Sequence, residues 1–207
     1  SFGLAYARLA YVRWWLSPLE GFTEEPLRKA LAHLNRIPEK EQYLLRAQAV
    51  KLEGGDYADG VPILQRGIEL YPNDKELVYN LGDFAYHAHE LKLAIEQFER
   101  VLNMDPNHER ALQHLTWAYR DVNDPVKMNE VARRYINTTG TSEAYNLLAE
   151  SYLMSGDLEE ATAIARNQVT LNPDNADARV ITGNVLIFSD HIEEGLAAYD
   201  SALTHVT

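Results

Sequence analysis

A short turn that contains proline recurs along the chain at nearly constant spacing. The segments IPEKE, LYPND, MDPNH and LNPDN contain Pro38, Pro72, Pro106 and Pro173. Successive prolines are 34, 34 and 67 residues apart, and the last interval is close to two periods, with Gly140 where another proline would fall. A fixed period of this length is typical of proteins built from stacked repeats. Because proline ends one helix and starts the next cleanly, these turns are expected to separate repeat units.

Each unit has the pattern of two antiparallel helices joined by a short turn. Apolar residues follow the helical period of about 3.6 residues. The pattern is interrupted once per unit by turn-forming residues, at 54–56, 89–90, 123–124, 156–157 and 189–191. Asp56, Asp124 and Asp157 are suited to cap the helix that follows, and Pro125 suits a first helical position. No strand pattern is present, so we expect an all-α fold of about twelve helices.

Length and charge exclude several classes of protein. The 207 residues are enough for one large domain, two small ones or a stack of small units. The formal net charge of −12 repels phosphate backbones, so nucleic acid is not an expected partner. The most apolar stretch, residues 9–16, is short and contains Arg13, so no membrane insertion is expected. The absence of cysteine excludes disulfides and thiolate metal sites. The cytoplasm is the favoured compartment, although composition does not define it.

The residues at fixed positions within the units resemble those of a known family. If Lys75 is position 1, then positions 7, 8, 20, 24, 27 and 32 hold Leu81, Gly82, Ala94, Phe98, Val101 and Pro106. In this pattern the chain resembles the tetratricopeptide repeat family. The resemblance covers units at 41–74, 75–108, 109–141, 142–175 and 176–207, with a degenerate helix pair at 1–40, in a single array over 1–207. It implies an α-solenoid of stacked antiparallel helix pairs that winds as a right-handed superhelix.

Packing within the units can also be predicted. Positions 8 and 20 are expected to face each other where the two helices of a unit cross most closely, as for Gln48 and Gly60. Small residues there let the backbones approach. Met128 stands at position 20 of a unit that is one residue short, which predicts looser packing. Pro62 lies in the first turns of its helix, which predicts a late start or a kink.

The resemblance implies a scaffold that binds a peptide or partner protein in a concave groove lined by the first helix of each unit. Positions 4, 7, 8 and 11 form one stripe of that helix, so positions 2, 5, 6, 9, 12 and 13 lie broadly on the other side. The predicted binding residues are Arg46, Tyr79, Asn80, Asp83, Arg110, Gln113, His114, Trp117, Asn146 and Glu150. The same face also holds Trp14, Trp15, Glu143, Asp177, Asn184 and Phe188. Aromatic residues and arginine are typical of binding hot spots, whereas Trp14 and Trp15 could instead pack between helix pairs.

Some members of this family bind a C-terminal carboxylate with a clamp of lysine, asparagine and arginine. Asn80 and Arg110 match two of the clamp positions, and His114 replaces an arginine. Leu45 and Ala49 replace the lysine and asparagine of an earlier unit. Half of the clamp is missing, so recognition of this kind is not expected. A weaker anionic anchor at Asn80, Arg110 and His114 remains open.

No catalytic residue, metal site or cofactor is predicted. The segment HAHE at 87–90 resembles a metal motif, but histidines two residues apart point to different sides of a helix. The glycines fall on turns and close crossings, so no loop is suited to cradle a phosphate. No nucleophile stands with a suitably spaced histidine and acid. An enzyme is therefore not expected.

Two functional hypotheses of different class follow. The first is a scaffold for a separate peptide or partner protein. The second is a regulatory or sensory module that acts in cis on a catalytic or DNA-binding domain outside these residues. The chain starts and stops at the same point of the repeat, without a polar capping helix. Since solenoid ends need covering, this suggests a segment of a longer protein, or ends covered by a partner or, in a homo-oligomer, by a second copy.

Overall fold

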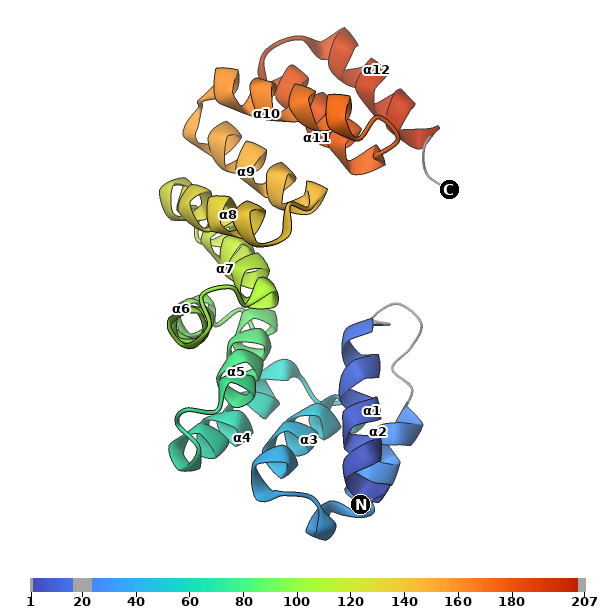
Figure 1. Cartoon of the computed structure of the whole chain (residues 1–207), viewed down its shortest axis with the longest axis vertical. Coiled ribbons are helices and arrows are strands. Elements are labelled where there is room, and N and C mark those ends of the chain that lie inside the picture. Colours follow the sequence, from blue (N-terminus) through green and yellow to red (C-terminus); the bar gives the residue numbers. More distant parts are fainter. Residues whose placement is uncertain (1, 17–23, 205–207) are drawn as a thin grey trace. The chain divides into compact units, whose positions relative to one another are not determined.

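The computed structural model describes residues 2–16 and 24–204, and these form an all-α structure with no strand (Figure 1). The first six α-helices are α1 (Phe2–Leu16), α2 (Glu24–Leu31), α3 (Glu39–Leu52), α4 (Tyr57–Leu70), α5 (Lys75–His87) and α6 (Leu91–Met104). The others are α7 (Glu109–Asp121), α8 (Pro125–Thr139), α9 (Ser142–Ser155), α10 (Leu158–Leu171), α11 (Ala176–Phe188) and α12 (Ile192–Leu203). A short 3-10 helix, η1, covers Leu34–Arg36. The predicted all-α fold and the helix number are thus confirmed over the described residues.

Contacts divide the chain into two compact units. Unit 1 comprises Ser1–Met104 and unit 2 comprises Asp105–Thr207. Within each unit, successive helices pack against one another, as α4 does with α3 and α5. None of the helices in the described residues has both the length and the apolar composition needed to span a bilayer.

The turns predicted within the repeats separate successive helices, and two of the predicted caps are confirmed. The Asp56 carboxylate accepts a hydrogen bond from the backbone N–H of Tyr57 at 2.6 Å. In return, Asp59 accepts one from the Asp56 backbone N–H at 2.9 Å, which completes a capping box at the start of α4. Asp124 caps α8 by accepting from the backbone N–H of Lys127 at 3.1 Å. Pro125 occupies the first turn of α8, where its missing N–H costs little.

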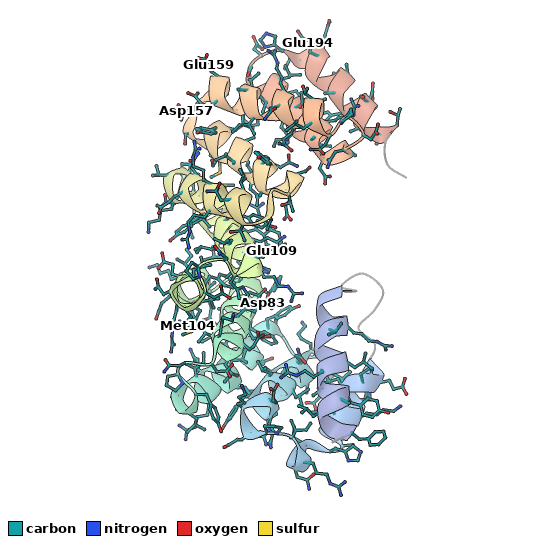
Figure 2. All side chains as sticks on the ribbon, viewed as in Figure 1. Asp83, Met104, Glu109, Asp157, Glu159 and Glu194 are labelled. Carbon is teal, nitrogen blue, oxygen red and sulfur yellow. The ribbon has the colours of Figure 1, made fainter. Side chains whose placement is uncertain are left out.

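The predicted cap at Asp157 is wrong. Asp157 (labelled in Figure 2) immediately precedes α10, but its side chain accepts no capping hydrogen bond from the described residues. In the tight connection from α9, Gly156 has a left-handed φ of 81°. The first N–H of α10, that of Leu158, donates to the carbonyl oxygen of Gly156 at 3.0 Å. The backbone of the turn thereby satisfies the first N–H group at this helix start.

Gly140 stands where another repeat proline would fall. Gly140 ends α8 with a left-handed φ of 63°, a conformation that glycine adopts readily, and its N–H donates to the carbonyl of Ile136 at 2.8 Å.

Pro62 lies inside α4, yet the helix begins directly at Tyr57, so the predicted late start is wrong. A proline at this point deprives only the carbonyl of Ala58 of its helical donor, and Ala58 is exposed to water.

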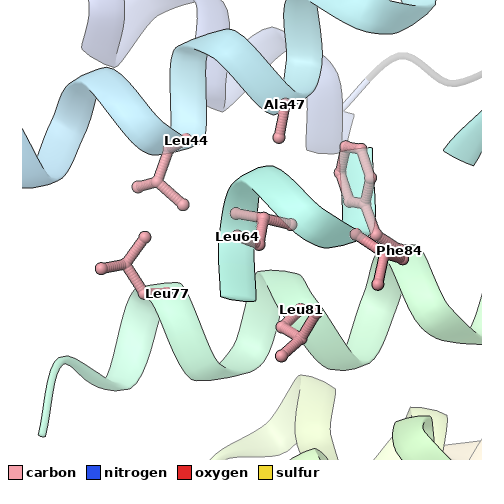
Figure 3. Packing of buried hydrophobic residues seen from close by; sticks show 7 residues of the cluster. Leu44, Ala47, Leu64, Leu77, Leu81 and Phe84 are labelled. Carbon is pink, nitrogen blue, oxygen red and sulfur yellow. The ribbon is translucent and has the colours of Figure 1, made fainter. Parts of the chain in front are cut away.

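One apolar cluster of unit 1 joins α3, α4 and α5. Figure 3 shows side chains of α3 and α5 directed toward Leu64 of α4. The buried members are Leu44, Ala47, Val61, Leu64, Leu77, Leu81 and Phe84. Gly60 lies beside this cluster, and a Cβ atom at Gly60 would come within 2.5 Å of the Phe84 ring. The small residue at position 60 is therefore required by the Phe84 ring of α5, a contact that the predicted pairing of Gly60 with Gln48 did not include.

Other close helix crossings follow the prediction in part. A Cβ atom at Gly195 would lie 2.9 Å from the carbonyl oxygen of Gly183, so these two positions do face each other across α11 and α12. A Cβ atom at Gly82 would instead meet the ring of Phe98 at 2.8 Å. Met128 of unit 2 is fully buried. The position thus accommodates a large side chain without exposing it to solvent.

Candidate functional site

Helices α7, α9 and α11 form one face of unit 2, here called the first-helix face. Helix α9 contacts both α7 and α11. Among the predicted binding residues, α7 carries Arg110, Gln113 and Trp117, and α9 carries Asn146 and Glu150. All five are partly exposed. The structure therefore brings these side chains onto neighbouring helices of one unit.

A carboxylate on α9 is hydrogen-bonded to side chains of α7 and α8. Glu143 accepts hydrogen bonds from the Gln113 side chain at 2.7 Å and 2.8 Å, one on each oxygen. It also accepts one from the hydroxyl of Tyr135 on α8, at 3.4 Å. Burial of Tyr135, together with the negative charge of Glu143, raises the pKa of the tyrosine to about 12. Both effects disfavour the tyrosinate, because it would be poorly solvated and close to another anion.

The raised pKa predicts a loss of stability in alkaline solution. Between the ordinary value of 10.0 and about 12, the folded chain keeps the Tyr135 proton and the unfolded chain releases it. The free energy of unfolding should therefore fall as the pH rises through this range. Tyr135→Phe should remove this contribution, so the variant should show a shallower decline in urea unfolding measured across these pH values. An equal slope in both proteins would contradict the prediction.

A hollow opens between α9 and α11 on the first-helix face. Its lining residues are Glu143, Asn146, Asp177, Val180, Ile181 and Asn184. The side-chain Oδ1 of Asn146 is buried and accepts no hydrogen bond from the described residues. Asn184 is held by the hydroxyl of Tyr199 on α12, which donates to its Oδ1 at 2.6 Å. Asp177 is exposed, and none of the residues that line the hollow is cationic.

A second acidic group lies further along α9. Burial raises the pKa of Glu150, the nearby Arg120 guanidinium opposes this effect, and the charge of Asp121 adds to it. The Arg120 Nη1 lies 3.9 Å from a Glu150 carboxylate oxygen. On α11, Phe188 follows Asn184 by one helical turn and is largely exposed. The face thus combines acidic groups with exposed apolar surface.

Four of the predicted binding residues are buried instead of lining an open surface. They are Tyr79, Asn80, Asp83 and His114. The side-chain amide of Asn80 donates to the carbonyl of Glu76 in its own helix at 2.7 Å. The Nδ1 of His114 likewise lies 2.9 Å from the Arg110 carbonyl. These polar atoms are engaged by the preceding turn of the same helix, which counting positions could not reveal.

Three predicted residues of unit 1 contact side chains of the same unit. Tyr79 packs its ring 5.9 Å from that of Phe98, and Asp83 (labelled in Figure 2) lies 3.7 Å from the Nε2 of His87. Arg46 is exposed and donates to the side chain of its helical neighbour Gln42 at 3.3 Å. The side chains of Trp14 and Trp15 lie outside the described residues.

Some residues of the hollow were not among the ten predicted binding residues. Glu143, Asp177 and Asn184 hold groove positions that the sequence identified without selecting them. Val180 and Ile181 hold positions 5 and 6 of their unit, so the same counting could have found them. Both are apolar, so residue type does not distinguish them from core residues. Position in the repeat therefore indicates these two residues, whereas residue type does not.

Comparison with known proteins confirms the family. Models described as tetratricopeptide repeat match residues 51–118 and 142–175. Similar solved structures include MamA 41-end from Desulfovibrio magneticus RS-1, with 19% identity over 81% of this chain and 96% of that one, and a TM-score of 0.70. YrrB, described as a TPR protein with an unusual peptide-binding site, has 17% identity over 87% and 92%, with a TM-score of 0.63. TTC0263, a thermophilic TPR protein of Thermus thermophilus, has 17% identity over 81% and 91%, with a TM-score of 0.58.

A search of curated proteins gives no match. At these identities the solved structures establish the fold alone. The two repeat models show that the chain belongs to the tetratricopeptide repeat family over residues 51–118 and 142–175, and the helical pairs agree with this. This membership supports a protein-interaction scaffold as the general function, in a family that is generally non-catalytic.

Proposed function

We propose that the chain binds a segment of a partner protein on the first-helix face of unit 2, with a basic side chain of the partner in the hollow between α9 and α11. The hollow itself carries the proposal, since the described side chains of α9 and α11 leave space between them there. Its residues stand at first-helix positions, as expected of a groove in this family. The solved structure of YrrB, described as having a peptide-binding site, is consistent with this use of the fold.

The chemistry of the lining favours a cation. Asp177 supplies an exposed carboxylate, and Asn146 supplies a buried oxygen that accepts no hydrogen bond from the described residues. A buried acceptor without a donor costs about 1–3 kcal/mol, and a donor from a ligand would recover that cost. Lysine and arginine offer several N–H donors together with the charge that complements Asp177. An acidic segment would instead be repelled.

The surroundings of the hollow favour an apolar residue beside the basic one. Val180 lines the hollow and is 41% exposed, and Phe188, two turns further along α11, is 68% exposed. Trp117 on α7 adds a partly exposed aromatic ring to the same face. Large exposed apolar side chains on one face are typical of interaction surfaces. The expected ligand is therefore a segment with lysine or arginine next to an aliphatic or aromatic residue.

The proposal can be tested by selecting ligands from a random peptide library displayed on phage. Selected peptides should share lysine or arginine next to an apolar residue. In calorimetric titration with a selected peptide, Asp177→Asn should weaken binding about tenfold or more, because a hydrogen bond to a charged group contributes about 1.5–3 kcal/mol. Glu160→Gln is the matched control, since it removes one negative charge from an exposed position on α10 outside the hollow.

The outcomes separate the proposal from its alternatives. Equal weakening by both variants would mean that only the net charge matters. Selected peptides rich in acidic residues, or binding unchanged by Asp177→Asn, would contradict a cation in the hollow. If no peptide is selected, the proposal that the chain binds a separate protein segment would be wrong. The alternative, a regulatory module that acts in cis on another domain, would then be favoured.

A further inference from the structure

Helix α5 carries a carboxylate and an imidazole side by side in its last two turns. Asp83 and His87 are four residues apart, so they lie on the same side of the helix. The Nε2 of His87 lies 3.7 Å from the Oδ1 of Asp83, which is too long for a hydrogen bond between these two atoms. Two ligand atoms of a tetrahedral zinc ion stand about 3.4 Å apart. A small rotation of the exposed His87 side chain would therefore bring both atoms to coordinating distance of one ion.

The pair combines a buried ligand with one that solvent can reach. The Asp83 side chain (labelled in Figure 2) is 2% exposed, whereas that of His87 is 42% exposed. A buried carboxylate is most stable beside a cation or as the ligand of a metal ion. His87 supplies a positive charge only when it is protonated. A divalent ion would supply that charge while the imidazole stays neutral and free to coordinate.

Neighbouring aromatic rings hold the imidazole in place. Tyr57, the first residue of α4, stacks on the His87 ring with the centroids 4.8 Å apart and the planes inclined by 29°. Tyr86 meets the same ring edge-on, with the centroids 5.4 Å apart. A metal ligand whose ring is already oriented by its neighbours loses less freedom when the ion binds.

The charges around the pair favour a cation. Burial raises the pKa of Tyr57, and the negative charges of Asp83 and Asp56 raise it further, which shows that both carboxylates act at this place. The carbonyl groups at the C-terminal end of α5 contribute further negative potential. The ammonium of Lys51 lies 4.5 Å from the centroid of the Tyr57 ring and opposes these groups. Two carboxylates and a helix end thus stand against one ammonium.

We propose that Asp83 and His87 bind a divalent transition-metal ion of the class of Zn²⁺. Imidazole nitrogen with carboxylate oxygen suits such ions, whereas Mg²⁺ and Ca²⁺ prefer oxygen ligands alone. Water or other donors would fill the remaining positions of the ion. The pair differs from the two histidines of the HAHE segment, because His89 lies beyond the end of α5 with a left-handed φ of 60°. The histidine of that segment on α5 is thus joined by an acid one turn earlier.

Calorimetric titration of the chain with Zn²⁺ tests the proposal. His87→Ala and Asp83→Asn should each weaken zinc binding at least about tenfold, because each removes a ligand. His89→Asn is the matched control, since it removes an imidazole from an exposed position two residues away, and asparagine tolerates the left-handed φ. It should bind Zn²⁺ like the unmodified chain. In nitrogen-15 NMR spectra, the Nε2 signal of His87 should shift when Zn²⁺ is added.

Three outcomes would overturn the proposal: no zinc binding by the unmodified chain, binding unchanged by His87→Ala, or equal weakening by His89→Asn. Far-UV circular dichroism should show unchanged helicity in each variant. If the buried Asp83→Asn loses helicity, the exposed His87→Ala and the NMR signal still decide the result. Both ligands belong to unit 1 and the hollow belongs to unit 2, so zinc binding and peptide binding can each fail without the other.

Discussion

Replacing Phe84 by alanine is expected to lower the free energy of unfolding by about 3–5 kcal/mol, the usual cost of removing a buried phenylalanine ring. Phe84 is fully buried at the contact between α4 and α5. Its ring meets that of Tyr57 edge-on, with the centroids 5.2 Å apart. It also fills the space beside Gly60, where α4 has no side chain. The truncation would thus leave a cavity between two helices that cannot easily close it.

Urea unfolding followed by far-UV circular dichroism would measure this effect. Phe188→Ala is the control, because Phe188 is 68% exposed and its truncation should change stability by less than about 0.5 kcal/mol. A sharper test adds Gly60→Ala. Alone, this change should destabilise, since its Cβ would lie 2.5 Å from the ring. Combined with Phe84→Ala it should be tolerated, so additive effects would contradict the contact.

Replacing Gly195 by valine is expected to lower the free energy of unfolding by about 1–3 kcal/mol through overpacking. A Cβ atom there would lie 2.9 Å from the carbonyl oxygen of Gly183 and 2.6 Å from the Ile187 side chain. The carbonyl is backbone of α11 and cannot rotate away as a flexible side chain could. The helices would therefore have to separate, which would disturb the other contacts between α11 and α12.

Ala197→Val is the matched control for this prediction. Ala197 lies two residues away on α12 and is exposed, so valine there changes helix propensity without meeting α11. Thermal or urea unfolding of both variants would separate the crowding from the cost of a β-branched residue in a helix. Equal stability of the two variants would show that α11 and α12 can separate at no cost.

The helices of this chain could be predicted because their signals are local. The prolines, the turn residues and the helical period each act within a few residues, so the starts of α4 and α8 fall at the predicted turns. Two predictions about helix starts were wrong, the cap at Asp157 and the late start caused by Pro62. Before α10 the backbone of the turn satisfies the first N–H group, and in α4 the carbonyl that Pro62 leaves without a donor belongs to the exposed Ala58. Such hydrogen bonds depend on the conformation of the turn, which residue type alone does not specify.

The surroundings of the candidate binding residues could be predicted only in part. Counting positions sorts residues by their angle around their own helix, and it correctly placed Gln113 and Asn146 on neighbouring helices of one face. It did not separate them from Asn80 and His114, which are buried. Burial depends on the side chains of adjacent helices, and these are set by packing between elements distant in sequence.

The sequence by itself determined the repeat period, the helical pairs and the family, since each follows from short-range rules repeated along the chain. Only the tertiary structure decided that Phe84 makes Gly60 necessary and that α9 and α11 leave a hollow. The physical reason is that a helix stripe has the same pattern whether another helix covers it or water does. Which stripes are covered is settled by the helices that pack beside them.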